Sequence, residues 1–381
     1  MPCPYGVEAL MELSLLALLL VMALAYANGT NDVSKAIATL VGSGVTNYRT
    51  AIMWGTAWTV VGAGLSAFVA SAMLKTFSMG LVQPGIATPP ALALAILVGA
   101  MAWVLIASRT GLPVSTTHAL IGALVGAGLV SIGSQGLAWS AIAGKVGLPL
   151  LLSPVLAFTL SFLLHPVVKR VAAHWEGACL CVMPASRALV TIDARGNTRM
   201  LIQTNVLGQP VVAVPAQCER AGLKGLAVGL DSIHWLSSGL ASLARGANDA
   251  PKILAMLLLG SAAASRPNGT VQFGMLAVVA LAMGFGSYIG GFRVTEVLAE
   301  KVTRMDHAEG LSANLTTSSL VLVSATMGLP VSTTHVSSSA IIGIGVLKGF
   351  GAVRWTTVRD MALAWIVTMP VAGILAGLAY F

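Results

Sequence analysis

Ala27-Asn-Gly-Thr-Asn-Asp-Val-Ser-Lys35 and Ala244-Arg-Gly-Ala-Asn-Asp-Ala-Pro-Lys252 each place an Asn-Asp pair in apolar sequence, once in each half of the chain. A lysine follows each Asn by four residues. An ionised carboxylate in a hydrocarbon environment costs several kcal/mol, so it persists only beside a partner or a water-filled cavity. The recurrence of this costly arrangement predicts one site that is built from two related halves.

The composition is that of an integral membrane protein. Of the 381 residues, 56% are hydrophobic and 9% are charged, whereas about 25% of residues are charged in ordinary globular domains. Continuous apolar runs of roughly 20 residues predict membrane-spanning helices and not the short strands of a barrel. We expect an all-α polytopic membrane protein with about 10–12 membrane segments. The net charge of +8 lies largely in loops, so it indicates membrane orientation and not a nucleic-acid partner.

A second motif is repeated at the same spacing as the Asn-Asp pair. Gly111-Leu-Pro-Val-Ser-Thr-Thr-His118 recurs unchanged at residues 328–335. Both motifs recur at an offset of 217 residues (111 to 328, and 31 to 248). Two motifs that share one offset predict an internal duplication. We therefore divide the chain into a first membrane repeat (1–164), a polar segment (165–223) and a second membrane repeat (224–381).

The distribution of charge predicts the orientation of the two repeats. Seven Lys and Arg residues lie in or just beyond the polar segment, whereas the sequence before the first apolar run carries Glu8 and Glu12 and no basic residue. By the positive-inside rule, the polar segment is cytoplasmic and the N-terminus is external. The first repeat then crosses the membrane an odd number of times, and the second starts from the opposite side. Inverted-topology repeats with broken or re-entrant helices are typical of secondary transporters.

The repeated hydroxyl motif is typical of a helix that begins inside the membrane. Proline suits the first turn of a helix because its missing N–H has no partner there, and Ser115 or Thr116 can cap the helix start. The free N–H groups and positive dipole end of such a helix form an anion site. Hydroxyl clusters also join neighbouring membrane helices, and that alternative remains open. We assign substrate binding to Ser115, Thr116, Thr117, Ser332, Thr333 and Thr334.

The Asn-Asp pairs combine groups that bind hard cations. Gly29 and Gly246 allow the backbone to unwind, and unwound carbonyls with Asn and Asp oxygens suit Na⁺, while an Asp alone can carry a proton. The alternative is that each carboxylate pairs with the lysine three residues later. We assign cation (metal) binding to Asp32, Asp249, Asn31 and Asn248, and substrate binding to Asn31, Asn248, Lys35 and Lys252.

Other ionisable residues flank these motifs. His118 and His335 end the hydroxyl motifs, and we interpret them as packing side chains, with a proton relay as the alternative. Arg109 and Arg245 precede the motifs, and we expect them to extend toward the membrane interface.

The Asn-Asp motifs in two inverted halves, each with its own Gly-Leu-Pro-Val-Ser-Thr-Thr-His motif, resemble the inorganic phosphate transporter (PiT) family of secondary transporters. The resemblance covers roughly residues 10–164 and 224–381. It implies a homodimeric symporter that moves phosphate across the cell membrane with Na⁺ or H⁺ by alternating access. The Asn-Asp residues would belong to the phosphate and ion site, and the hydroxyl residues would contact the anion from re-entrant helix starts. The chain departs from the family pattern at Asn28-Gly-Thr30 and at Lys35, where many relatives carry Asn.

Both phosphate and sulfate fit such a site, and they differ in whether they carry a proton at neutral pH. At neutral pH phosphate keeps a proton that it can donate to a carboxylate, whereas sulfate would leave that carboxylate unpaired. Asp32 and Asp249 therefore favour phosphate, and a sulfate or related oxyanion permease is the alternative function. A receptor or channel is a third hypothesis. We expect no enzyme, since no nucleophile–base pair or metal triad is present in the sequence, and no cofactor.

The polar segment predicts a small cytoplasmic β-rich insertion. Residues 188–192 and 198–202 have the pattern of two strands with Gly196 at the turn between them, and residues 211–214 can add a third strand. Cysteines 179, 181 and 218 with His174 are candidate metal ligands, although free thiols are favoured in a reducing cytoplasm.

Overall fold

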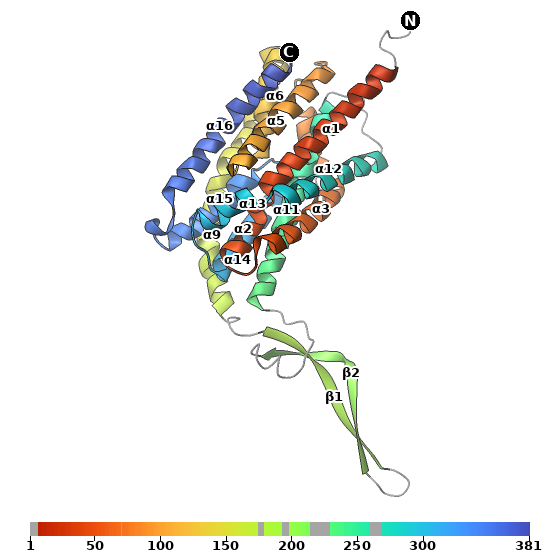
Figure 1. Ribbon diagram of the computed structural model, residues 1–381, viewed down its shortest axis with the longest axis vertical. Helices are drawn as coiled ribbons and strands as arrows, with labels where there is room; N and C mark the ends of the chain where they lie inside the picture. The colour runs from red at the N-terminus through yellow and green to blue at the C-terminus, as the bar shows by residue number, and fades with distance from the viewer. Residues whose placement is uncertain (1–6, 70, 174–178, 193–197, 214–228, 260–268) are drawn as a thin grey trace.

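The computed structural model describes residues 7–69, 71–173, 179–192, 198–213, 229–259 and 269–381. These residues form a bundle of helices with a hairpin of two strands at one end (Figure 1). The first repeat contains α1 (Val7–Asp32), α2 (Ser34–Gly42), α3 (Tyr48–Val69), α4 (Ser71–Met79), α5 (Pro90–Thr110), α6 (Thr116–Ser131), α7 (Gly133–Gly136), α8 (Trp139–Ala141), the π-helical η1 (Ile142–Gly147) and α9 (Leu148–Ala173). The strands β1 (Cys179–Ile192) and β2 (Thr198–Ala213) follow. The second repeat contains α11 (Leu230–Leu259), α12 (Gly269–Gly290), α13 (Phe292–Glu300), α14 (His307–Met327), α15 (Thr333–Leu347), the 3₁₀ turn η2 (Phe350–Ala352) and α16 (Trp355–Ala379).

The duplication is visible in the helix boundaries. Helices α5 and α14 begin and end 217 residues apart, and so do the starts of α6 and α15. In Figure 1, α1 enters the bundle from the end that carries the N-terminus, whereas α11 enters from the opposite end, next to the hairpin. The last helices of the repeats, α9 and α16, likewise run in opposite directions. Equivalent helices are therefore antiparallel, as an inverted repeat requires.

The two repeats are interleaved and do not form separate bundles. Helix α3 packs on α11 and α12 packs on α1, while α9 packs on α15 and α16 packs on α6. The last of these contacts brings backbones together: a Cβ at Gly126 would lie 2.0 Å from the carbonyl oxygen of Gly373. Small residues allow such approaches between membrane helices. Each half-site is consequently held by helices from both repeats.

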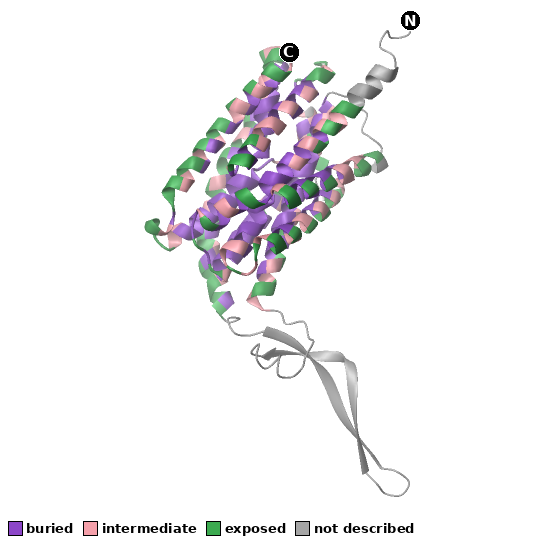
Figure 2. Ribbon diagram, in the orientation of Figure 1, coloured by how far each residue is buried: buried purple, intermediate pink, exposed green. Residues whose placement is uncertain are grey.

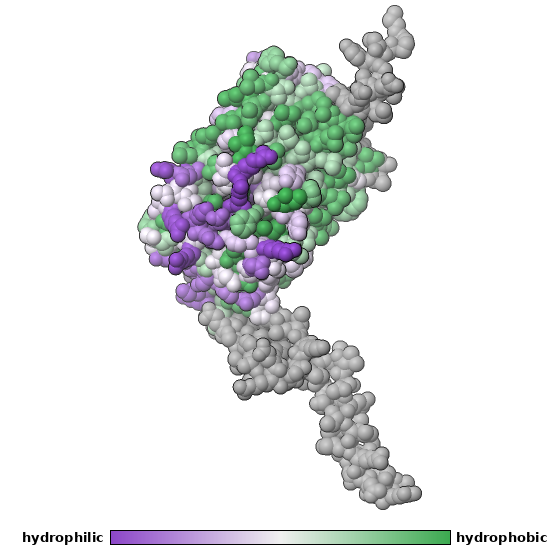
Figure 3. Space-filling view, in the orientation of Figure 1, coloured by the Kyte–Doolittle hydropathy of each residue, from purple (hydrophilic) through white to green (hydrophobic). Residues whose placement is uncertain are grey.

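Six helical segments of the described chain are long and apolar enough to cross a membrane, and the helices 116–131 and 333–347 are apolar but shorter. This count is lower than the 10–12 segments expected from the sequence. Helices α11 and α14 have 30 and 21 residues, but their buried polar residues keep them out of the apolar class. Buried residues run through the middle of the bundle (Figure 2), and hydrophobic side chains cover most of the upper part of the face in Figure 3. The all-α membrane fold is thus supported.

The two Asn-Asp motifs differ in backbone. In the first repeat the helix is interrupted after Asp32, and the Val33 N–H lies 3.4 Å from the Gly29 carbonyl. In the second repeat the motif lies inside the continuous helix α11. Val33 in the first repeat keeps helical φ and ψ of −58° and −33°, so the expected unwinding is found at neither motif. The glycines serve close packing: a Cβ at Gly29 would lie 2.1 Å from the Met283 carbonyl oxygen, and one at Gly246 2.3 Å from a backbone oxygen of α3.

The expectation of a small β-rich module is corrected by the structure. Residues 165–173 continue α9, and the other described residues of the polar segment form a single antiparallel ladder in which Cys179 pairs with Ala213 and Ile192 pairs with Thr198. Val211 pairs with Cys181 inside this ladder and does not start a third strand. Two strands alone cannot enclose a core, so the described residues contain no β domain beside the all-α fold. The predicted turn at Gly196 and the residues His174 and Cys218 lie outside the described residues.

Candidate functional site

The two hydroxyl motifs form two re-entrant loops of the same conformation, one in each repeat. Gly111 caps the end of α5 and Gly328 caps the end of α14, with φ of 77° and 68° in the left-handed region that glycine tolerates. The chain is then extended for four residues before α6 or α15 begins. Ser115 accepts a hydrogen bond from the backbone N–H of His118 (3.2 Å), and Ser332 makes the equivalent bond at 3.1 Å. The predicted N-cap is therefore confirmed in both copies.

These caps leave donors at both helix starts. Each cap serine accepts a hydrogen bond through its oxygen, so its hydroxyl hydrogen remains available to another acceptor. The first backbone N–H groups of α6 and α15 have no partner within their own helices, and the positive end of each helix dipole lies at the same point. Both helix starts are buried within the bundle. The two helix starts thus provide hydrogen-bond donors and positive electrostatic potential, which bind an oxyanion.

The first Asn-Asp motif is bound to the first re-entrant loop. Asn31 Nδ2 donates to the Leu112 carbonyl (3.0 Å), and the Val114 N–H donates to Asn31 Oδ1 (3.2 Å). The Asn31 side chain therefore both donates to and accepts from the loop backbone, as a paired β-strand does. In the second repeat, Asn248 Nδ2 donates to Asp249 Oδ1 at 2.8 Å and lies 3.5 Å from the Val331 carbonyl. Both Asn side chains thus fix the loop of their own repeat.

Cross-repeat contacts join the two half-sites. Lys252 Nζ donates to Thr117 Oγ1 (2.9 Å), and Thr334 Oγ1 donates to the Val114 carbonyl (2.6 Å). The structure brings all twelve residues singled out in the sequence analysis into this buried region, each between 0 and 3% exposed. They are Asn31, Asp32, Lys35, Ser115, Thr116, Thr117, Asn248, Asp249, Lys252, Ser332, Thr333 and Thr334. The motif residues of the two repeats therefore lie together in one buried region.

Asn28, which the sequence analysis did not select, lies at the centre of the site. Its Nδ2 donates to Asp32 Oδ2 (2.9 Å), Thr116 Oγ1 (3.1 Å) and Asp249 Oδ2 (3.2 Å). One amide therefore contacts the carboxylates of both repeats. Without a donor between them, two carboxylates so close would repel each other. Asn28 holds the two halves of the site together.

Arg245 is the equivalent of Asn28 in the second repeat, and its position corrects an expectation. It does not extend to the membrane interface but is 1% exposed. Its Nη2 donates to Thr59 Oγ1 (2.9 Å) and Ser287 Oγ (3.3 Å). It lies one helical turn before Asn248 in α11, at the centre of the bundle, so its side chain cannot reach water. Aligning the two repeats places Asn28 opposite Arg245, so the sequence could have singled out Asn28 as well.

The two motif histidines meet across the repeats. The rings of His118 and His335 have centroids 4.5 Å apart, and His335 also packs 4.1 Å from Trp365. Both histidines are at least nine-tenths buried. This arrangement accords with the packing role expected from the sequence and places the pair at the inner ends of α6 and α15.

A tract of buried polar side chains, here called the polar tract, lies mainly in the second repeat. Several of its polar atoms have no hydrogen-bond partner among the described residues, which is uncommon for buried groups. The tract lines mutually packed helices α2, α11, α14 and α15. The residues concerned are Thr39, His234, Ser242, Asn314, Thr316, Ser337 and Ser338. The members in the second repeat correspond, 217 positions earlier, to Ala17, Ala25, Leu97, Gly99, Leu120 and Ile121. At these six positions of the described chain, the second repeat carries buried polar side chains where the first repeat carries apolar residues or glycine.

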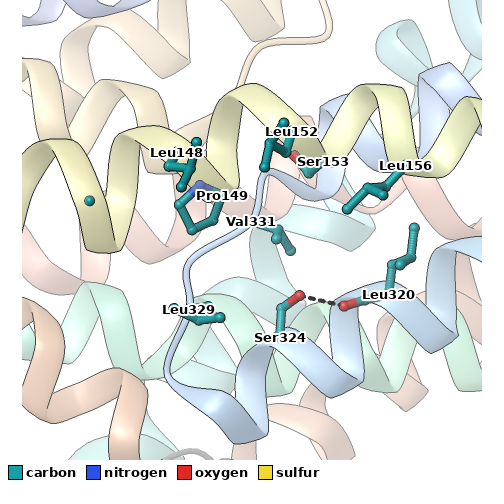
Figure 4. A pocket seen from close by; sticks show the side chains of 10 residues that line it. Leu148, Pro149, Leu152, Ser153, Leu156, Leu320, Ser324, Leu329 and Val331 are labelled. Atoms are coloured by element: carbon teal, nitrogen blue, oxygen red, sulfur yellow. Dashed lines mark hydrogen bonds between the residues drawn. The ribbon is translucent and has the colours of Figure 1, made fainter.

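An apolar cavity of about 400 Å³ lies beside the site, between α9, α14 and the second re-entrant loop (Figure 4). Half of its lining residues are leucine. Its two serine hydroxyl groups already have partners: Ser153 donates to the Leu150 carbonyl and Ser324 donates to the Leu320 carbonyl. It therefore offers nothing to bind an ion. Val331 lines this cavity, while its carbonyl accepts a hydrogen bond from Lys252 on the side of the site. The loop thus separates the cavity from the charged groups.

Comparisons with known proteins agree with this geometry. The family model described as "Phosphate transporter family" matches residues 28–376. The chain belongs to the phosphate transporter family. Among its relatives, the probable low-affinity inorganic phosphate transporter of Mycobacterium tuberculosis is 30% identical, over 97% of this chain and 78% of the relative. That of Rhizobium meliloti is 29% identical, over 93% and 92% of the two chains.

The fold of this phosphate transporter family member is also found among solved structures. A structure described as the sodium-dependent phosphate transporter matches with a TM-score of 0.76 and 21% identity, over 97% of this chain and 98% of that chain. At this identity the match supports the fold. With the family match, it identifies a multi-pass membrane protein of phosphate transport and confirms the family resemblance drawn from the paired motifs.

Proposed function

We propose that the chain is a symporter that carries inorganic phosphate across the cell membrane together with a cation, Na⁺ or H⁺, by alternating access. The observation that carries this proposal is the junction of the repeats, where Lys252 reaches Thr117 and Thr334 reaches the Val114 carbonyl. An anion between the two helix starts would contact both repeats. A rocking motion between the repeats would then open its site to one side of the membrane and next to the other.

The charges around the motifs favour an anion as the substrate. Three buried cationic side chains, Lys35, Lys252 and Arg245, surround two buried carboxylates, Asp32 and Asp249. Buried charge is tolerated only when it is paired, so an excess of cationic groups is balanced when an anion enters. The helix starts add uncharged donors that point from both repeats. We propose that phosphate lies between the starts of α6 and α15, bound by the hydroxyl residues of both motifs.

Protonation supports phosphate over sulfate in such a site. Asp32 and Asp249 share the donor Asn28, and either can accept the proton that phosphate retains at neutral pH. Sulfate has no proton to donate and would repel both carboxylates. A site built to hydrogen-bond a substrate hydroxyl rejects an analogue that lacks it.

The polar tract suggests the route to one side of the membrane. It lines α11 and α14, which begin at the end of the bundle next to the hairpin (Figure 1). We propose that phosphate passes between the site and this end along the tract, and that this end is cytoplasmic while the N-terminus is external, as the charge distribution predicts. The apolar cavity behind Val331 leaves space toward α9 into which the second re-entrant loop can move.

Uptake of labelled phosphate into proteoliposomes tests this proposal. We expect uptake to be driven by a cation gradient and to resist competition by sulfate. Absence of phosphate flux under both a Na⁺ and a pH gradient would contradict the proposal. Equal competition by sulfate would instead favour a general oxyanion permease on the same fold.

A further inference from the structure

The ammonium group of Lys35 lies in a cage of oxygen atoms. Its Nζ donates to Asp32 Oδ1 at 2.5 Å, Asn31 Oδ1 at 2.6 Å and the Asn31 carbonyl at 2.8 Å. These three acceptors are a carboxylate, an amide and a backbone carbonyl at the end of α1. Carbonyls at the ends of broken helices are the groups that coordinate alkali cations in secondary transporters. The cage is thus of the chemical type that binds a hard cation.

Lys252 lies in a second cage of similar composition. Its Nζ donates to Thr117 Oγ1 at 2.9 Å, to the Val331 carbonyl at 3.2 Å and to Asp249 Oδ1 at 3.5 Å. Because α11 continues through the second motif, the backbone carbonyl here comes from the re-entrant loop of the same repeat and not from a helix end. The hydroxyl comes from the other repeat. Each Asp therefore has one ammonium group beside it, and each ammonium group has three oxygen neighbours.

These contacts leave the lysines little capacity to hold an anion. An ammonium group has three donors, and each lysine already directs its Nζ to three acceptors within the protein. Lys35 and Lys252 are 2% and 1% exposed. Lys35 donates within the first Asn-Asp motif. Lys252 donates to protein oxygens that include Thr117 at the start of α6. An anion there would therefore be bound mainly by the hydroxyl and N–H donors of the helix starts.

We propose that the ammonium groups of Lys35 and Lys252 are tethered cations that take the positions of coupling sodium ions, so that phosphate binds and moves without Na⁺. The proposal deepens the proposed function and rests on it. A bound Na⁺ carries the energy of its gradient because it enters from one side and leaves on the other. A lysine supplies the same charge to the carboxylate but cannot leave. Of the two candidate coupling ions, the proton therefore remains.

Direct binding of radiolabelled sodium to the purified protein tests this inference without phosphate flux. We expect no saturable Na⁺ binding to the wild-type protein. Lys35→Asn and Lys252→Asn remove the ammonium group and leave the oxygen acceptors, so each variant is expected to bind Na⁺ saturably. Lys301→Asn is the matched control, because Lys301 pairs with Glu296 at the surface (2.8 Å), and it is expected to bind no Na⁺.

Each result decides the inference. Saturable Na⁺ binding by the wild type that Asp32→Asn abolishes would overturn it, and so would folded Lys35→Asn and Lys252→Asn variants that bind no Na⁺. If a variant does not fold, the inference is tested by measuring the affinity of the wild type for phosphate in Na⁺ and in choline. Affinity that is equal within about twofold supports the inference, whereas a gain of about tenfold with Na⁺, equal to about 1.4 kcal/mol, overturns it.

Uptake in the same preparations separates this inference from the proposed function. Phosphate uptake by the wild type that requires Na⁺ would overturn the tethered-cation role and preserve the symporter. Proteoliposomes that take up no phosphate under any gradient would overturn the symporter, while the sodium-binding experiment would still decide whether the lysines occupy cation positions.

Discussion

Replacement of Asn28 by leucine tests whether one amide holds the two half-sites together. Leucine has a similar volume but cannot donate, so the variant loses the hydrogen bonds from Nδ2 to Asp32 (2.9 Å) and Asp249 (3.2 Å). A hydrogen bond to a charged group contributes about 1.5–3 kcal/mol. Asp32 keeps its bond from Lys35, and Asp249 keeps its bond from Asn248, so we expect a net loss of about 2–4 kcal/mol.

Electrostatic repulsion gives the same order of magnitude. Two unit charges about 5 Å apart repel by about 3 kcal/mol at an effective dielectric constant of about 20. Because about 1.4 kcal/mol corresponds to a factor of ten, the initial rate of phosphate uptake at low phosphate should fall roughly 30- to 700-fold.

The assay is uptake of labelled phosphate by proteoliposomes that contain equal amounts of folded wild-type or variant protein. Asn47→Leu is the control, because Asn47 caps the start of α3 through Thr50 outside the site, and it should leave uptake close to wild type. If Asn28→Leu elutes as a folded protein and its uptake is within about threefold of wild type, the bridge between the carboxylates has no role in transport.

Three further predictions concern the helix starts, the packing of the repeats and the polar tract. Ser332→Ala removes the N-cap of α15 at a cost of about 1 kcal/mol and should lower kcat/KM for phosphate uptake about fivefold; unchanged kinetics would refute a role for this helix start. Gly126→Ala places a Cβ against the Gly373 carbonyl and should destabilise the fold by about 1–3 kcal/mol. In thermal denaturation it should melt below Gly64→Ala, whose added Cβ has no neighbour within 4 Å; equal melting would show that α6 and α16 separate readily. In a background without the native cysteines, Ser338→Cys should react with a charged thiol reagent faster than Ile121→Cys, its repeat equivalent, and equal rates would argue against a polar route.

The residues of the candidate site were largely predictable from the sequence. A carboxylate in an apolar segment costs free energy in a membrane whatever the rest of the fold is, so it can be recognised from its neighbours in sequence. Asp32 and Asp249 stand out in apolar sequence without any knowledge of the fold, and the common offset of 217 residues joins them to the hydroxyl motifs. The capping role of Ser115 was predictable for the same reason, since Pro-x-Ser directly before a helix depends on neighbouring residues alone.

Other features depended on contacts between segments far apart in the chain. Arg245 was expected at the membrane interface because its neighbours in sequence say nothing about the depth of α11 in the bundle. Gly29 and Gly246 were expected to loosen the backbone, but they admit the carbonyls of neighbouring helices. The β-rich module was wrong in extent because strand propensity does not reveal how many strands can pair.

The sequence by itself determined the class of protein, the duplication and the identity of the charged and hydroxyl groups, because hydrophobicity, motif spacing and charge are properties of the chain. Only the tertiary structure decided which oxygen atoms surround Lys35 and Lys252, and that Asn28 joins the two carboxylates. Those relations arise where α1, α11 and the two re-entrant loops meet, and hydrogen bonding acts over about 3 Å. The helices that bring the groups within that distance come from both repeats.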